Sequence, residues 1–261
     1  LPNNLIDEVL YSNDWGGNAT GSSLELIDPT FDNLLVESWQ DSLDVGGSPG
    51  IENSLIIYGC MDTLADNYNA EANVEDGSCI YPDYTNMIII TEIHYNPSSN
   101  FQGDDYNYEF IEIYNKSSQV IPLDGFKFTM QGSAEDASEY NRLNFPSVDF
   151  PPDEYFVIAI NSTPPIDNQG VNPYAELELG VNLFEWVGDQ AWTLNNYDAM
   201  TLRIKGPDDS VVTSVTYSGQ VPWPQSVTST GSSIEIIDIY GPQDDASSWQ
   251  SSYIVNGTPG Q

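Results

Sequence analysis

The chain has 261 residues and a formal net charge of −35, with 40 acidic and five basic side chains. Such a charge excludes nucleic acid as a partner, because phosphate contacts need Lys and Arg, and it disfavours anionic membrane surfaces. No run of eighteen apolar residues occurs, so we expect no direct membrane insertion. The acidic surface favours calcium, or it serves solubility in salty water, and both interpretations stay open.

Residues 1–50 repeat the end of the chain. The segment Gly21-Ser22-Ser23-Leu24-Glu25-Leu26-Ile27-Asp28 matches residues 231–238, Trp39 matches Trp249, and residues 46–50 match residues 256–260, each with an offset of 210. Matching order and spacing over a segment of this length indicates tandem domains. We therefore interpret residues 1–50 as the C-terminal part of a preceding repeat, that is, a partial second sandwich.

Residues 51–83 are predicted to be a linker followed by an Asn/Asp-rich module between Cys60 and Cys79. Oxygen-bearing side chains crowd into it, and some alternate as ligands do in calcium loops, although an EF-hand would place its glycine and glutamate elsewhere. The alternative is that they cap turns through bonds to the backbone. Unfolding with and without EDTA distinguishes the two. The calcium candidates are Asp62, Asp66, Asn67, Asn69, Glu71, Asn73, Glu75 and Asp76.

From residue 84 onward the sequence predicts many short β-strands separated by Gly, Pro, Asn and Asp turns. Within residues 109–114, Ile111 and Ile113 share one face, and Phe110, Glu112 and Tyr114 the other. Residues 206–209 have the signature of a hairpin turn. No helical periodicity appears, so we predict an all-β, antiparallel sandwich. The expected strands cover residues 87–95, 109–114, 127–130, 155–160, 199–204, 211–217 and 233–239.

Several motifs in this stretch occur together in one order. They are residues 90–97 (ITEIHYNP), 109–115 (EFIEIYN), 123–126 (LDGF), 150–159 (FPPDEYFVIA), 215–217 (VTY), 222–224 (PWP), 231–236 (GSSIEI), Trp249 and 257–260 (GTPG). Together they resemble the lamin-tail domain. The resemblance implies an immunoglobulin-like sandwich over residues 84–261, no catalytic residues common to the family, and a binding or structural role on secreted or surface proteins.

The Cys-bounded module also resembles a short repeat of surface proteins from marine Bacteroidota. We therefore expect a Cys60–Cys79 disulfide; two free thiols, or half a zinc site, are the alternatives. Zinc needs four ligands, and His94 is the only histidine. Three Asp-Ser/Thr-apolar triplets resemble the O-glycosylation sequon of the same bacteria. They make Ser42, Thr63 and Ser210 glycosylation candidates, which an intact mass of the native protein tests.

No catalytic constellation is evident. His94 lies two residues from Glu92, but the sequence offers no activated nucleophile, nucleophile elbow, phosphate loop or dinucleotide fingerprint. Glu109 and Glu112 fall on opposite strand faces and so do not flank one glycosidic bond. Trp186 and Trp192, in a loop-rich stretch, are candidates for sugar stacking.

We therefore predict a non-catalytic, extracellular structural or adhesive repeat protein of the cell surface, part of a tandem or fibre-like assembly. Half a sandwich exposes an unpaired edge and an apolar face, so residues 1–50 need strands from upstream residues or another chain. The expected partners are copies of the chain or adjacent repeats, with glycans or surface proteins as further candidates. Calcium is the one cofactor considered. The alternative is a carbohydrate- or protein-binding accessory module of a larger secreted enzyme.

Overall fold

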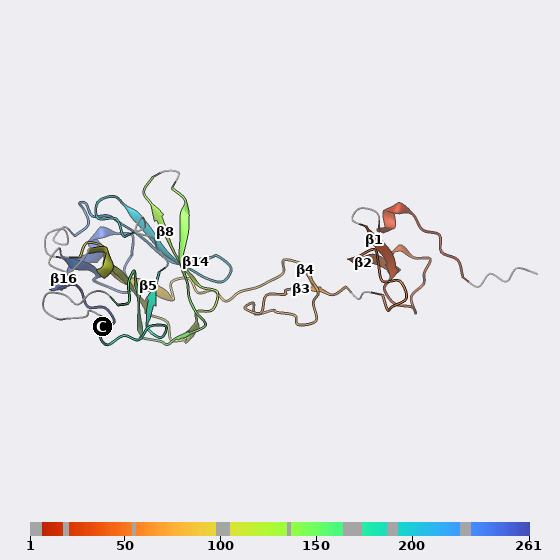
Figure 1. Ribbon diagram of the computed structural model, residues 1–261, viewed down its shortest axis with the longest axis horizontal. Coiled ribbons are helices and arrows are strands. Elements are labelled where there is room, and N and C mark those ends of the chain that lie inside the picture. The colour runs from red at the N-terminus through yellow and green to blue at the C-terminus, as the bar shows by residue number, and fades with distance from the viewer. Residues whose placement is uncertain are drawn as a thin grey trace, which may run out of the picture. The chain divides into compact units, whose positions relative to one another are not determined.

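The computed structural model describes residues 7–17, 21–53, 56–97, 105–134, 137–163, 174–186, 193–224 and 231–261. The chain divides into two compact units, Leu1–Ile80 and Tyr81–Gln261 (Figure 1). Within the described ranges the regular structure consists of β-strands and short 3₁₀ turns, so the prediction of an all-β protein is confirmed. None of the described helices is long and apolar enough to cross a membrane.

The C-terminal unit is built from two sheets. One has six strands, in the spatial order β12 (Leu183–Glu185), β11 (Tyr155–Ala159), β6 (Phe110–Asn115), β5 (Ile88–His94), β15 (Ser232–Ile236) and β16 (Trp249–Val255). The other has four, in the order β14 (Val211–Tyr217), β13 (Met200–Lys205), β8 (Lys127–Gly132) and β9 (Glu139–Asn144). The shorter elements are β7 (Ile121–Pro122), β10 (Asp149–Phe150), η3 (Asp105–Tyr108) and η4 (Ala246–Ser248).

The main core is formed by inward-facing side chains of both sheets. Ile111 and Ile113 of β6 are fully buried in one cluster with Phe128 of β8 and Leu202 of β13. Phe110, which points to the other face of β6, belongs to a second buried cluster. The predicted period-two alternation of β6 is therefore confirmed, and side chains of opposite strand faces fill two separate cores.

The stretch between β11 and β13 differs from the prediction. β12 pairs in parallel with β11, which makes this edge of the sheet an exception to the antiparallel pattern. Trp186, just after β12, is 2% exposed, and its ring lies 6.0 Å from that of Phe128. The prediction that Trp186 is available to stack on sugars is therefore wrong, because the strand pairing draws it into the core. Trp192 lies outside the described residues.

The N-terminal unit contains a hairpin and a small module. The hairpin consists of η1 (Asn13–Trp15), β1 (Ser22–Leu26), η2 (Val36–Ser38) and β2 (Trp39–Val45), with β1 and β2 antiparallel. The module contains the short parallel pair β3 (Tyr58–Gly59) and β4 (Val74–Glu75). A disulfide joins Cys60 to Cys79, as predicted, which rules out the free-thiol and zinc alternatives for these two residues.

Candidate functional site

Three glutamates lie side by side on the six-stranded sheet. Strand pairing places Glu92 of β5 opposite Glu112 of β6 on one side and Glu235 of β15 on the other. A bulge at Thr91 separates the pair Ile90–Ile113 from the pair Glu92–Glu112. The extra residue turns Glu92 away from the core face that Ile90 occupies. We call this row of three carboxyl groups the glutamate ladder.

The end of the chain, residues 257–261, covers the glutamate ladder, and we call it the strap. The Thr258 amide donates to Glu92 Oε1 at 3.0 Å, and the Gly260 amide donates to Glu112 Oε2 at 2.7 Å. The Ser233 hydroxyl also donates to Glu92 Oε1. These hydrogen bonds hold the strap on the sheet.

Both central carboxyl groups hold protons more tightly than a free glutamate does. Burial raises the pKa of Glu92 to about 7, against hydrogen bonds from Ser233 and Thr258 that lower it. Burial, together with the nearby Glu92 charge, raises the pKa of Glu112 to about 8. Like charges so close cannot both be ionised cheaply in a buried place. The ladder therefore takes up protons as the sandwich forms.

The N-terminal hairpin repeats this end of the sandwich in its strand pairing. Leu24 lies opposite Asp41 and Leu26 opposite Trp39; 210 residues later, Ile234 lies opposite Ser251 and Ile236 opposite Trp249. Each hairpin has an irregularity at the same place in its first strand. The two tryptophan side chains also donate to matching backbone carbonyls, those of Asn33 and Gln243.

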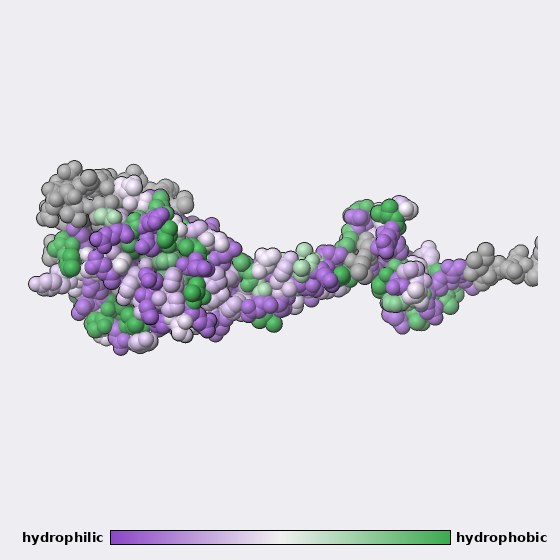
Figure 2. Space-filling model, turned by 90° about the horizontal axis from the view of Figure 1, so that it is seen from below, coloured by the Kyte–Doolittle hydropathy of each residue, from purple (hydrophilic) through white to green (hydrophobic). Residues whose placement is uncertain are grey.

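The two hairpins differ in what surrounds them. β15 pairs with β16 on one edge and with β5 on the other, whereas β1 pairs with β2 alone in the described part of its unit. Ile234 is fully buried, whereas its counterpart Leu24 is only partly buried. Upstream, after a small insertion, residues 8–12 (EVLYS) match residues 214–218 (SVTYS), so Tyr11 corresponds to Tyr217. Tyr217 is fully buried, whereas Tyr11 is 72% exposed. Hydrophobic residues accordingly appear on the surface of the N-terminal unit (Figure 2).

The predicted calcium residues mostly serve the backbone of their own module. Carboxylate or amide oxygens of Asp62, Asn69, Asn73 and Asp76 each accept from a nearby backbone N–H. Such bonds are those of turn-capping side chains. Among the described residues, the one cluster of three possible metal-ligating side chains is Cys60, Glu75 and Cys79. It contains a single carboxylate, and its two cysteines are joined in the disulfide.

Two of the remaining calcium candidates, Glu75 and Asn67, also bind backbone groups. Glu75 accepts from the Met61 and Gly77 amides at 2.7 and 2.8 Å. Asn67 binds the backbone of Ser78 and Ile80. Asp66 and Glu71 are exposed. Calcium binding here stays a prediction, and the geometry favours the turn-capping alternative.

The glycosylation candidates divide by exposure. Thr63 and Ser210 are exposed. Ser42 is 4% exposed, and its hydroxyl accepts from the Ser23 amide and donates to the Asp44 carbonyl. The folded hairpin therefore leaves no room for a glycan on Ser42, and a glycan at the other two positions stays a prediction.

His94 is a core residue. It is 1% exposed, and its two ring nitrogens lie 3.0 Å from the Tyr108 carbonyl and 2.9 Å from the Gly231 carbonyl. The carbonyls favour the protonated ring, but burial outweighs them and lowers the pKa of His94 to about 4. The ring thus connects two loops to the end of β5.

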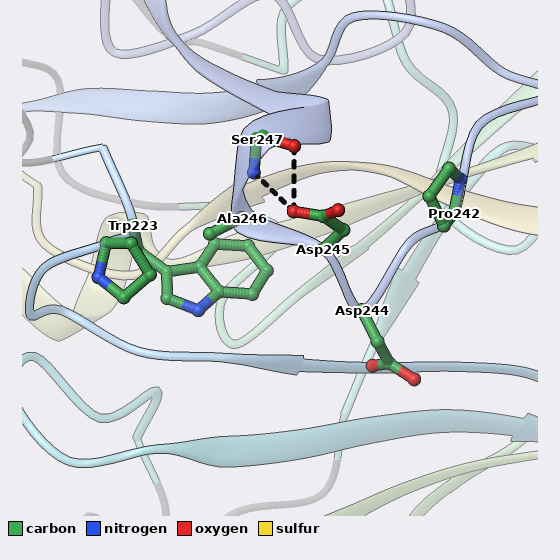
Figure 3. A pocket seen from close by; sticks show the side chains of 7 residues that line it. Trp223, Pro242, Asp244, Asp245, Ala246 and Ser247 are labelled. Atoms are coloured by element: carbon green, nitrogen blue, oxygen red, sulfur yellow. Dashed lines mark hydrogen bonds between the residues drawn. The ribbon is translucent and has the colours of Figure 1, made fainter.

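An open hollow of about 650 Å³ lies beside η4 (Figure 3). Trp223 forms one wall and packs on Trp249 with ring centroids 5.8 Å apart. Asp245 accepts from the Ser247 amide and hydroxyl, and Asp244 accepts from the Thr216 amide. Asp245 therefore caps its own turn and Asp244 binds the backbone of β14, and we assign no ligand to this hollow.

Sequence reasoning missed the glutamate ladder as a site. Its members come from β5, β6 and β15, which are far apart in the chain, and the bulge at Thr91 changes which face Glu92 occupies. One signal was available. Glu25 and Glu235 recur in the repeated motif together with the glycine-rich segments 46–50 and 256–260.

Comparison with known proteins identifies the fold of the C-terminal unit. No curated protein matched the chain. Residues 82–219, more than half of the chain, match the family described as Lamin Tail Domain, a domain that is in general non-catalytic. The match covers β5 to β14 and ends before β15 and β16. The chain belongs to the Lamin Tail Domain family.

Proposed function

We propose that the chain is part of a non-catalytic, extracellular structural or adhesive repeat protein, in which lamin-tail units follow one another in a tandem or fibre-like surface assembly. The observation that carries the proposal is the N-terminal hairpin. It reproduces β15 and β16 in register, but its first strand has no counterpart of β5 among the described residues.

An open strand edge beside an apolar face is the surface that strand addition uses. In the C-terminal unit, β5 supplies that strand and the four-stranded sheet covers the face. In the N-terminal unit Leu24 and Trp39 are only partly buried, whereas their counterparts Ile234 and Trp249 are buried. Residues 8–50 are accordingly the closing strands of a lamin-tail sandwich whose opening strands come from a neighbouring repeat.

An extended chain tests this proposal. Glu8 matches Ser214 in the repeat, so a second copy of residues 82–213 is placed directly before Glu8. We expect calorimetry to show an additional cooperative transition, because residues 8–50 then complete a second sandwich. Leu24→Glu in this extended chain should abolish the additional transition, because the matching Ile234 is fully buried.

Val45→Glu is the matched control, because Val45 and its counterpart Val255 are both exposed, at 78% and 53%. It should leave the additional transition in place. If the extended chain shows only the transition of the original chain, residues 8–50 do not complete a sandwich and the repeat proposal fails. The alternative function, as an accessory module of a secreted enzyme, requires a catalytic domain in the same gene rather than further repeats.

A further inference from the structure

An open hollow of about 320 Å³ in the N-terminal unit lies between the start of the hairpin and residues 46–51. Three hydrogen-bond donors belong to residues that line it: the Ser23 hydroxyl and the amides of Ser48 and Gly50. Within the described part of the chain none of the three has an acceptor. Ser23 and Ser48 are half-buried and Gly50 is exposed, so these donors face solvent in the chain alone.

The counterparts of these donors all bind the glutamate ladder in the C-terminal unit. The Ser233 hydroxyl and the Thr258 amide donate to Glu92, and the Gly260 amide donates to Glu112. The place that the two carboxyl groups fill in the C-terminal unit corresponds to the open hollow in the N-terminal unit.

Residues 46–50 already have the backbone of the strap. Gly47 and Gly257 both have a φ of +76°, and Gly50 and Gly260 both have a φ of +84°. The turn bond also recurs, from Ile51 to the Ser48 carbonyl and from Gln261 to the Thr258 carbonyl. Residues 46–50 therefore adopt the backbone conformation of the strap although, in the described part of this unit, no carboxyl groups of a β5–β6 pair lie against them.

The side-chain hydroxyls show the effect of the missing ladder members. Thr258 Oγ1 lies 3.3 Å from Glu92 and 3.5 Å from Glu235. The matching Ser48 Oγ instead donates to Glu25 alone, at 2.5 Å. Residues 1–80 contain no Lys, Arg or His, so in this unit the N–H and O–H donors are what can receive carboxyl groups.

We infer that the N-terminal unit holds a preformed receptor for two carboxyl groups, made by Ser23, Ser48 and Gly50, and that its ligand is a glutamate pair on adjacent strands of another lamin-tail repeat. The occupant is a strand pair like β5 and β6, because in the C-terminal unit that pair presents Glu92 and Glu112 to the strap. This inference rests on the proposed function and adds the chemistry by which a repeat is recognised.

The test uses the full chain and a fluorescein-labelled peptide of residues 85–116, which carries both strands. We expect saturable binding by fluorescence anisotropy. Replacing Glu92 and Glu112 together by Ala should weaken binding at least tenfold, because the receptor loses its acceptors. Replacing both by Gln should restore binding to within about threefold, because the amide oxygen still accepts.

Glu109→Ala in the peptide is the matched control, because Glu109 accepts from the Leu194 amide, which lies outside both the peptide and the receptor. It should bind like the parent peptide, and Leu24→Glu in the full chain should abolish binding of all peptides. Equal binding of the Glu92/Glu112 alanine peptide and the Glu109 alanine peptide would overturn the receptor, as would absence of binding by the parent. Either result leaves the calorimetric test of the repeat proposal unaffected.

Discussion

Raising the pH from 5 to 8 is expected to lower the free energy of unfolding of the C-terminal unit by on the order of 4 kcal/mol. Glu92 and Glu112 have folded pKa values near 7 and 8, above the value of 4.5 for a free glutamate. Between these values the folded protein keeps protons that the unfolded chain has released. Their stabilising contribution is therefore complete below about pH 4.5 and is lost as the pH rises through 7 and 8.

Glu112→Gln should remove much of this dependence. The glutamine keeps the size of the side chain and stays uncharged, so the variant should match the parent near pH 5 and exceed its stability at pH 8 by roughly 2 to 3 kcal/mol. Glu154→Gln removes the same charge from an exposed position and should leave the slope unchanged. Urea unfolding at each pH measures the three proteins. A parent and a Glu112→Gln variant with the same slope would disprove the proton uptake by the ladder.

Gly257→Ala is expected to destabilise the C-terminal unit by about 3 kcal/mol or more. A Cβ atom on Gly257 would overlap the Glu92 carboxylate and would lie 2.8 Å from Ser233 Oγ and 3.0 Å from Phe110 Cζ. These neighbours are buried and hydrogen-bonded or packed, so they have little room to move. The backbone also has a φ of +76° there, which L-residues rarely adopt.

Gly180→Ala separates the two causes. Gly180 has a φ of +81° in the same unit, and a Cβ atom there would meet nothing within 4 Å. Gly180→Ala should lower the free energy of unfolding by about 1 kcal/mol, because it introduces only the backbone strain of a positive φ. The difference between the two variants in thermal or urea unfolding then measures how closely the strap approaches the ladder. Equal destabilisation by Gly257→Ala and Gly180→Ala would mean that the strap is not in close contact with Glu92.

The parts of the fold that depend on local pattern were predictable. Alternation in residues 109–114 predicted which side chains of β6 enter the main core, and the turn at residues 206–209 predicted the hairpin of β13 and β14. The repeat offset of 210 predicted that two hairpins would share their strand pairing. In each case a few neighbouring residues, or two copies of one motif, contain the whole signal.

The parts that depend on distant pairing were not predictable. Trp186 enters the core because β12 pairs with β11, and no periodicity in its own loop shows that pairing. The ladder depends on a bulge at Thr91 and on β15 reaching β5 across about 140 residues of chain, a contact that a single sequence does not encode locally. In the Cys-bounded module, cation binding and turn capping would use the same oxygen-bearing residue types at the same spacing. Only the folded geometry shows the capping bonds.

Hydrogen exchange at β1 shows whether the N-terminal hairpin is the closing part of an incomplete lamin-tail sandwich. In the chain alone, the β1 amides that face away from β2 should exchange at least roughly 100-fold faster than the matching amides of β15, because open edges exchange freely and paired core strands do not. In the chain extended by a second copy of residues 82–213, they should slow to the rate of β15. Protection of β1 equal to that of β15 in the chain alone would contradict the account, because the N-terminal unit would then be complete by itself.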